Sequence, residues 1–201
     1  MASTERTSPQ SAPNPDSVRQ VLIVLRAQAG DERAFADLMQ RHGEALLRYL
    51  TGLVGDDADD LFQETWLAVY RHLATLHDPA AFQVWLFRSA RHRALNWLRR
   101  HRRERELVVD APLDAIATDD ESDDTPTALD HLDAGRIDAA MHEMPPPQRE
   151  VLILRFRDDL SYAQIANVTA VPINTVRTRL HHAKKRLAHL LSLGAPDARH
   201  S

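Results

Sequence analysis

The segment 106–133 restricts the fold more than any other feature, because it is too acidic to belong to a folded core. It contains ten of the chain's 29 Asp and Glu residues and no Lys or Arg. A run of like charges repels itself and is typical of a solvated linker. We therefore expect a disordered tail (1–17), a first unit (18–105), an acidic flexible linker (106–135), a second unit (136–193) and a C-terminal tail (194–201).

The two predicted units are basic once this segment is set aside. The 25 Lys and Arg residues of the whole chain exceed the 19 remaining acids by six. Between Ser161 and Pro196 there is no acid at all. Such a charge asymmetry indicates a polyanionic partner, of which nucleic acid is the commonest.

Several classes of protein are disfavoured by the sequence. The chain has no cysteine, which excludes disulfides and thiolate metal sites. Its longest apolar runs, 21–25 and 151–154, are too short to span a bilayer, and the N-terminus lacks the apolar core of a signal peptide. There is no nucleophile with a base, no phosphate-binding glycine loop and no metal-ligand spacing. We expect a cytoplasmic protein without membrane insertion, cofactor, metal or enzymatic activity.

The first unit shows helical periodicity and no sustained strand alternation. Asp31 is a candidate N-cap for a helix that ends at Gly55, and "DDADD" (56–60) places acids at the positive end of a second helix. Pro79 opens a third helix, predicted over about 80–103, which finishes as "NWLRRHRRERE". Apolar residues recur at steps of three and four in the first two helices: Phe35, Leu38, Met39, Leu46, Tyr49, Leu50 and Leu53, then Leu61, Phe62, Trp66, Val69, Tyr70 and Leu73.

The second unit is predicted to contain four short helices. One is stopped by the prolines at 145–147, and the others cover 148–157, 161–168 and about 172–191. The fold class is therefore all-α, with two small helical domains. The second unit has fewer than about 60 residues, so hydrophobic burial alone gives it marginal stability.

The last two helices match a helix-turn-helix. Ser161 and Gln164 form a capping-box pattern, and Pro172 suits the first turn of the following helix. Arginines near the start of a helix in the major groove can donate both bonds of a fork to guanine O6 and N7. The alternative is a solvated basic face on an ordinary helical hairpin.

Residues 88–105 combine eight arginines and one glutamate with Trp97, and they follow Phe82, Trp85 and Phe87. Aromatic faces beside guanidinium groups can hold unstacked bases and a phosphate backbone. The alternative is that the aromatic rings are core and only the arginines face solvent; for Trp85 and Trp97 both interpretations stay open.

Three motifs in this order resemble an extracytoplasmic-function (ECF, group IV) sigma factor of bacterial RNA polymerase. They are "ADDLFQETWLAVYRHL", "FQVWLFRSARHRALNWLRRHRR" and "PPPQREVLILRF…LSYAQIANVTAVPINTVRTRLHHAKKRL". The resemblance covers about 31–105 (sigma region 2) and 136–193 (sigma region 4). It implies promoter-specific transcription initiation, with core RNA polymerase (clamp helices and flap), promoter DNA and an anti-sigma factor as partners.

The resemblance also implies roles for individual residues. Polar anchors for the polymerase clamp helices are Asp60, Gln63 and Glu64. Recognition and melting of the minus-10 element fall to Phe82, Trp85, Arg88, Arg91, His92, Asn96, Arg99 and Arg100. Contacts with the minus-35 element fall to Arg155, Ser161, Tyr162, Thr175, Arg177, Thr178, Arg179, His181, His182, Lys184 and Lys185.

The chain departs from the family pattern at three positions. Ala170 and Asn174 stand where relatives usually have glycine, and His92 stands where many have asparagine. A left-handed Ala170 would be strained by about 1 kcal/mol. His92 is either a base-contacting residue or a core histidine. Two other functions remain open, a stand-alone helix-turn-helix regulator and a helical adaptor that binds an acidic protein.

Overall fold

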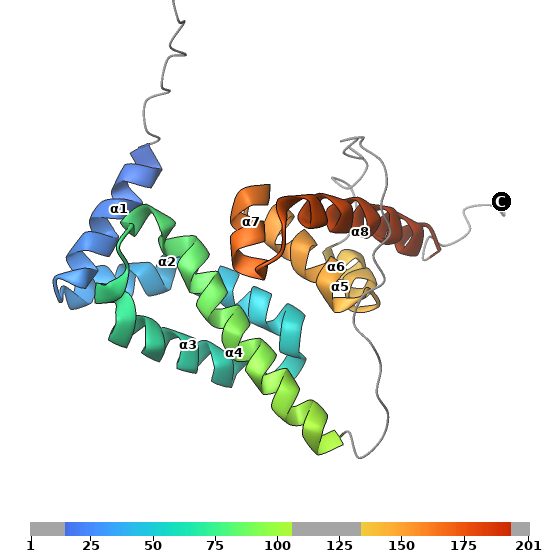
Figure 1. Cartoon of the computed structure of the whole chain (residues 1–201), viewed down its shortest axis with the longest axis horizontal. Helices are drawn as coiled ribbons and strands as arrows, with labels where there is room; N and C mark the ends of the chain where they lie inside the picture. Colours follow the sequence, from blue (N-terminus) through green and yellow to red (C-terminus); the bar gives the residue numbers. More distant parts are fainter. Residues whose placement is uncertain (1–14, 106–133, 194–201) are drawn as a thin grey trace, which may run out of the picture.

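The computed structural model describes residues 15–105 and 134–193, and these form two groups of helices (Figure 1). Residues 1–14, 106–133 and 194–201 lie outside the described residues, and with them most of the predicted linker and the whole predicted C-terminal tail. Ala134 and Gly135, predicted to end the linker, instead begin α5. No strand occurs in the described ranges, so the all-α prediction is confirmed there. The first group consists of α1 (Pro15–Gln28), α2 (Glu32–Val54), α3 (Ala58–His72) and α4 (Phe82–Arg105). The second consists of α5 (Ala134–His142), α6 (Pro146–Leu152), the π-helical segment η5 (Ile153–Arg157), α7 (Tyr162–Thr169) and α8 (Ile173–Leu193).

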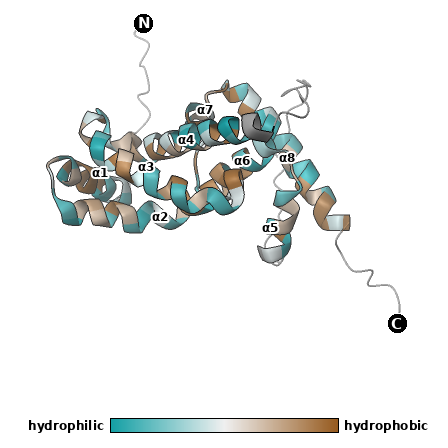
Figure 2. Cartoon of the chain, turned by 90° about the horizontal axis from the view of Figure 1, so that it is seen from below, coloured by the Kyte–Doolittle hydropathy of each residue, from teal (hydrophilic) through white to brown (hydrophobic). Residues whose placement is uncertain are grey.

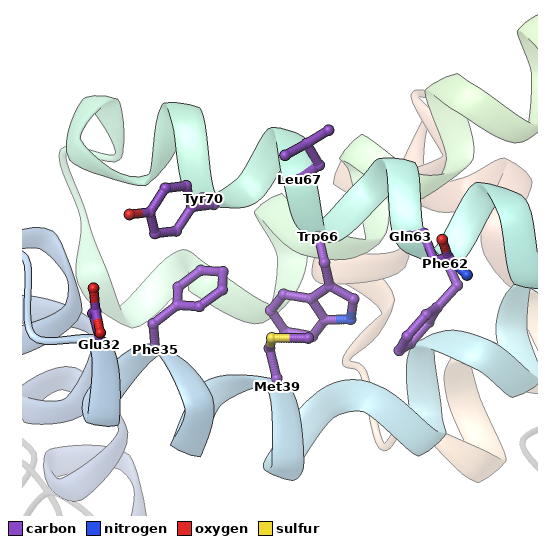
Figure 3. Close-up of a pocket in the computed structure, with 8 residues that line it drawn as sticks. All are labelled: Glu32, Phe35, Met39, Phe62, Gln63, Trp66, Leu67 and Tyr70. Carbon is purple, nitrogen blue, oxygen red and sulfur yellow. The ribbon is translucent and has the colours of Figure 1, made fainter.

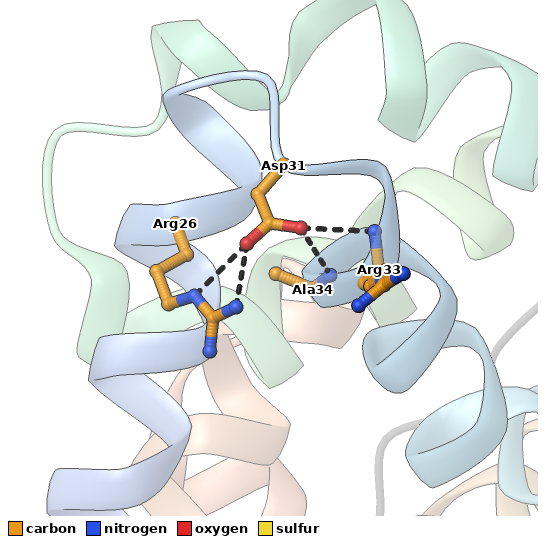
Figure 4. A network of polar contacts seen from close by, with 4 residues as sticks. All are labelled: Arg26, Asp31, Arg33 and Ala34. Carbon is orange, nitrogen blue, oxygen red and sulfur yellow. Dashed lines mark hydrogen bonds and ion pairs between the residues drawn. The ribbon is translucent and has the colours of Figure 1, made fainter.

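The start of α2 is fixed by the predicted cap. The Asp31 carboxylate accepts hydrogen bonds from the backbone N–H groups of Arg33 (3.0 Å) and Ala34 (3.1 Å). Its other oxygen accepts from the Arg26 guanidinium at 2.6 Å, which joins α1 to α2 (Figure 4). The hydrogen bond from Ala34 and then that from Arg26 lower the pKa of Asp31. At the other end of α2, Gly55 has a φ of 69°, a conformation that glycine adopts without strain.

Helix α1 corrects the prediction that residues 1–17 form a disordered tail. It begins at Pro15, within that segment. Proline is compatible with the first turn of a helix, because that N–H has no intrahelical partner. Ile23 and Val24 are buried, and α1 packs against α2. Tertiary packing therefore extends the order to residues whose local composition indicates a tail.

The prolines at 145–147 both end one helix and begin the next. Helix α5 stops at His142, while Pro145 occupies the N-cap of α6 and Pro146 its first position. The helix predicted over 148–157 therefore starts two residues earlier and changes to π-helical geometry at Ile153. The third predicted helix likewise begins with a 3₁₀ turn (Pro79–Ala81), in which the Asp78 carboxylate caps the Ala80 N–H at 2.9 Å.

Buried apolar residues face inward from every long helix. Fully buried side chains include Leu38 and Leu50 on α2, Phe87 on α4, Ile165 on α7 and Leu180 on α8. Figure 2 shows both hydrophilic and hydrophobic residues along the helices, which is the pattern of amphipathic helices around a core. The two groups also contact each other, since α4 packs against α7, and α2 packs against α6 and η5.

His42 makes the stability of the first group sensitive to acid. Its Nε2 accepts a hydrogen bond from the Gln20 amide at 2.8 Å, and its ring lies 5.3 Å from that of Phe82. Burial, reinforced by repulsion from Arg41, lowers the pKa of His42 from 6.5 to about 4.

We expect the free energy of unfolding to fall by about 2 kcal/mol between pH 7 and pH 5, because the unfolded chain protonates His42 first. The folded pKa lies below the unfolded one, so this loss occurs as the pH drops through 6.5 toward 4. Urea unfolding of the wild type and of His42→Gln at both pH values measures it. An equal pH dependence in both proteins would contradict the assignment to His42.

Candidate nucleic-acid interface

The helix-turn-helix is built from α7 and α8, which pack against each other. The predicted capping box is confirmed: the Gln164 N–H donates to Ser161 Oγ (3.3 Å), and the Ser161 N–H donates to Gln164 Oε1 (2.8 Å). Ala170 adopts the left-handed conformation, with φ 56° and ψ 39°. The turn is therefore made without glycine, at a cost of about 1 kcal/mol.

The orientation of α8 is fixed by its buried residues. Val176, Leu180, Ala183 and Leu187 recur at steps of three and four and are buried. This packing leaves Arg177 exposed beside the buried stripe. Of the other predicted minus-35 residues of α8, Lys185 is exposed. The remaining ones are half-buried: Thr175, Thr178, Arg179, His181, His182 and Lys184.

Several of these side chains have internal contacts that restrict their positions. The Thr178 hydroxyl donates to the Asn174 carbonyl at 3.1 Å, which holds it against its own helix. The rings of His181 and His182 meet edge to face at 5.7 Å. The Lys184 ammonium lies 5.6 Å from the centre of the Phe156 ring. Phe156 itself is 47% exposed, a feature that helical periodicity does not predict.

Arg155 and Tyr162 lie together at the beginning of α7. The guanidinium of Arg155 is 5.4 Å from the centre of the Tyr162 ring and donates to the Leu160 carbonyl at 3.3 Å. Ser161 is exposed between them in sequence. Three of the residues predicted to contact the minus-35 element therefore gather at the N-terminus of one helix, where backbone N–H groups and the helix dipole favour anions such as phosphates.

Helix α4 divides the predicted minus-10 residues into buried and accessible ones. Phe82 is 0% exposed and contacts the His42 and Trp85 rings, so in this structure it is a core residue that DNA cannot reach. Trp85 and Trp97 are half-buried and pack against the core, so each has both a packed and an accessible part. Trp97 also stacks on His101 at 3.8 Å with an interplanar angle of 23°.

The exposed face of α4 is basic. Arg88, His92 and Arg99 follow one another at steps of four and seven on one side of the helix, and all are exposed, as is Arg100. Exposure excludes His92 as a core histidine; its Nε2 lies 3.3 Å from the half-buried Asn96 amide. The half-buried Arg91 is instead engaged by Glu150, 2.8 Å from its Nε.

Helix α3 presents the predicted polar anchors beside an apolar groove that the sequence did not predict. Asp60, Gln63 and Glu64 are all exposed. The groove lies between α2 and α3, and Figure 3 shows its lining: Glu32, Phe35, Met39, Phe62, Gln63, Trp66, Leu67 and Tyr70. Tyr70 was expected on the buried face of its helix, but it is 61% exposed and lines the groove, with its ring edge to face with that of Phe35 (5.2 Å).

Asp158 is a buried carboxyl group at the end of η5. It is 6% exposed, and neither carboxyl oxygen has a hydrogen-bond partner among the described residues. Burial raises the pKa of Asp158 to about 7, although Arg48 and Arg157 oppose the shift.

We expect Asp158→Asn to stabilise the protein by about 2 kcal/mol at pH 8 relative to the wild type. The folded pKa lies above the unfolded value of 3.8, so the wild type loses stability as the pH rises from about 4 toward 7, whereas an amide does not ionise. Thermal or urea unfolding at pH 5 and pH 8 measures the difference. A variant that is no more stable than the wild type at pH 8 would show that Asp158 ionises without penalty.

The fold and the basic helices define a helical DNA-binding protein made of two units. Residues 38–104 match the family described as sigma-70 region 2, and residues 134–187 match sigma-70, region 4. In the described part of the chain, no helix has the length and apolarity needed to cross a membrane, and no group of three or more His, Asp or Glu residues could hold a metal ion.

Similar proteins share this organisation. The chain is 31% identical to the ECF RNA polymerase sigma-E factor of Haemophilus influenzae, over 82% of this chain and 91% of that protein. It is 33% identical to the RNA polymerase sigma-H factor of Pseudomonas aeruginosa, over 82% and 90% of the two chains. The solved structure of CnrH in complex with the cytosolic domain of CnrY superposes with a TM-score of 0.63 at 22% identity, covering 88% of this chain and 99% of that one.

The chain therefore belongs to the ECF RNA polymerase sigma factors. It directs promoter-specific transcription initiation with RNA polymerase.

Proposed function

We propose that α8 recognises the minus-35 element in the major groove, while Arg155, Ser161 and Tyr162 hold the flanking phosphates. The observation that carries this proposal is the orientation of α8: its buried stripe and the capped α7 turn the exposed Arg177 outward. Phosphate contacts position a protein on DNA, whereas side chains on base edges specify the sequence.

The exposed face of α4 is assigned to the non-template strand of the minus-10 element. Arg88, His92 and Arg99 supply cationic and ring groups along one face, and Arg100 adds an exposed cation beside it. The accessible parts of Trp85 and Trp97 supply surfaces on which extruded bases can stack, which offsets the unstacking cost of a few kcal/mol. Phe82 then supports this surface from the core.

Helix α3 is assigned to the clamp helices of core polymerase, with Asp60, Gln63 and Glu64 as polar anchors. The neighbouring apolar groove supplies the desolvated area that a stable protein interface needs at its centre. The polymerase carries out the chemistry of RNA synthesis, so the chain itself needs no catalytic group, and it acts in the cytoplasm where that polymerase transcribes.

An anti-sigma protein is proposed as the inhibitor of this chain, by analogy with CnrH, whose structure contains the cytosolic domain of CnrY. Affinity purification from the native cell followed by analytical ultracentrifugation would detect a stoichiometric partner. A chain recovered as free protein from uninduced cells would contradict this part of the proposal.

Transcription in vitro with purified core polymerase from the same cell tests the promoter assignment. Genomic fragments are transcribed with and without the chain, and the start sites are mapped. We expect new start sites that share minus-35 and minus-10 elements. DNA binding without new start sites would instead favour a stand-alone regulator.

A further inference from the structure

A buried polar cluster joins the two groups of helices. Glu150 of α6 is 5% exposed, and its Oε1 accepts hydrogen bonds from the Tyr49 hydroxyl of α2 and from Nε of Arg91 of α4, both at 2.8 Å. Tyr49 is fully buried, and this burial raises its pKa, so its hydroxyl remains a donor. The three side chains are 59 and 101 residues apart in sequence, and each hydrogen bond crosses between the groups.

Two further contacts bring the groups close around this cluster. The Arg149 guanidinium donates to the Gly52 carbonyl at 3.1 Å, and the Gln83 amide donates to the Asp158 carbonyl at 3.1 Å. A Cβ atom at Gly52 would lie 2.4 Å from Cδ1 of Ile153, so the surfaces meet without space for another side chain. At Gly52 the two groups are therefore in direct van der Waals contact.

This arrangement conflicts with promoter binding. Arg91, a predicted minus-10 residue, is held by Glu150, and α7 of the helix-turn-helix packs against α4. The minus-10 and minus-35 elements are about 25 base pairs apart, or about 85 Å along B-form DNA. Helix α7 packs directly on α4, which is only about 36 Å long, and the start of α8 follows α7, so the predicted minus-10 and minus-35 residues lie too close together to contact both elements at once.

We propose that Glu150 is an intramolecular latch, which holds the free chain in a closed form that cannot contact both promoter elements at once. The inability of the closed form to contact both promoter elements rests on the proposed function, whereas the latch itself rests on the contacts of Glu150. Removing its charge leaves the Arg91 guanidinium without its buried partner, which destabilises the closed form. In the open form Glu150 and Arg91 are solvated, so the same change has little effect there.

A distance measurement on the full chain tests the latch without DNA or polymerase. The chain contains no cysteine, so Ala74→Cys in the first group and Ala188→Cys in the second, both at exposed positions, can carry a donor and an acceptor dye selectively. Single-molecule energy transfer then counts closed and open molecules. Circular dichroism confirms that each variant retains the wild-type helix content.

We expect the wild type to be predominantly closed, and Glu150→Gln to raise the ratio of open to closed molecules about tenfold. Tyr49→Phe removes one hydrogen bond of the same cluster and should shift the ratio in the same direction by less. The matched control is Glu44→Gln, which neutralises an exposed glutamate paired with Arg48 on α2 and should leave the ratio unchanged. Full closure of both cluster variants, or equal opening of the control, would overturn the proposal.

Adding core RNA polymerase to the labelled wild type supplies a second arm. We expect the polymerase to convert closed molecules to the open form, because a promoter complex needs the two units apart. A polymerase-bound chain that stays closed would overturn the inhibitory role of the latch. Failure of the promoter assignment alone would leave the first arm unaffected, so the two failures are distinguishable.

Discussion

Replacing Arg177 and Arg179 together by alanine is expected to remove most of the discrimination for the minus-35 element. Each bidentate contact between an arginine and guanine contributes about 1–3 kcal/mol of discrimination, so the pair contributes about 2–6 kcal/mol if the two effects add. The buried Val176 and Leu180 keep α8 in place in the variant, so the loss falls on recognition and not on folding.

Competition binding of the polymerase complex measures this effect, with a promoter fragment from the mapped start sites and the same fragment carrying a scrambled minus-35 element. Arg186→Ala is the control, because Arg186 is an exposed cation of the same helix that lies two turns beyond Arg179. It should weaken binding to both fragments equally, as expected for loss of a general electrostatic contact. An unchanged preference in the double variant would remove the two arginines from base recognition.

Reversing the charge of Asp60 and Glu64, each to lysine, is expected to weaken binding to core polymerase by more than 100-fold. Both carboxylates are exposed on α3 beside the apolar groove. Bringing like charges together at a protein interface costs several kcal/mol. Binding of the fluorescently labelled chain to core polymerase measures the loss.

The matched control is Asp37→Lys with Glu44→Lys, which changes the net charge by the same amount at exposed positions of α2. We expect near wild-type affinity for it. Asp60 also complements the dipole in the first turn of α3, so thermal unfolding of both variants must be compared. Equal affinities of the two double variants would mean that the polymerase binds a different face.

Local chemistry made most helix boundaries and the α8 surface predictable. The capping contacts of Asp31, Gly55 and the pair Ser161 and Gln164 join residues that are close together in the chain, so these helix ends can be predicted from the sequence. The outward position of Arg177 follows in the same way from the apolar stripe of its helix. The start of α1 at Pro15 was missed because residues 15–17 belong by composition to the N-terminal tail, and their order depends on the packing of α1 against α2.

Long-range contacts could not be predicted from periodicity. Glu150 is an ordinary surface residue by sequence, and only the meeting of α2, α4 and α6 buries it. The same applies to Asp158, which is 6% exposed and whose backbone carbonyl accepts a hydrogen bond from Gln83, 75 residues away. The resemblance implied a DNA contact for Arg91, and the spacing of arginines on α4 gives no sign of its partner 59 residues away.

The left-handed alanine in the helix-turn-helix has a consequence for the search of DNA. Ala170 has fewer accessible backbone conformations than glycine, and the packing of α7 on α8 selects a strained one. A hinge at this turn is therefore less favoured than it would be with glycine at the same position. In the proposed DNA complex, phosphate contacts by α7 would then also set the angle at which α8 enters the groove, so that little rotational freedom is left to be lost on binding.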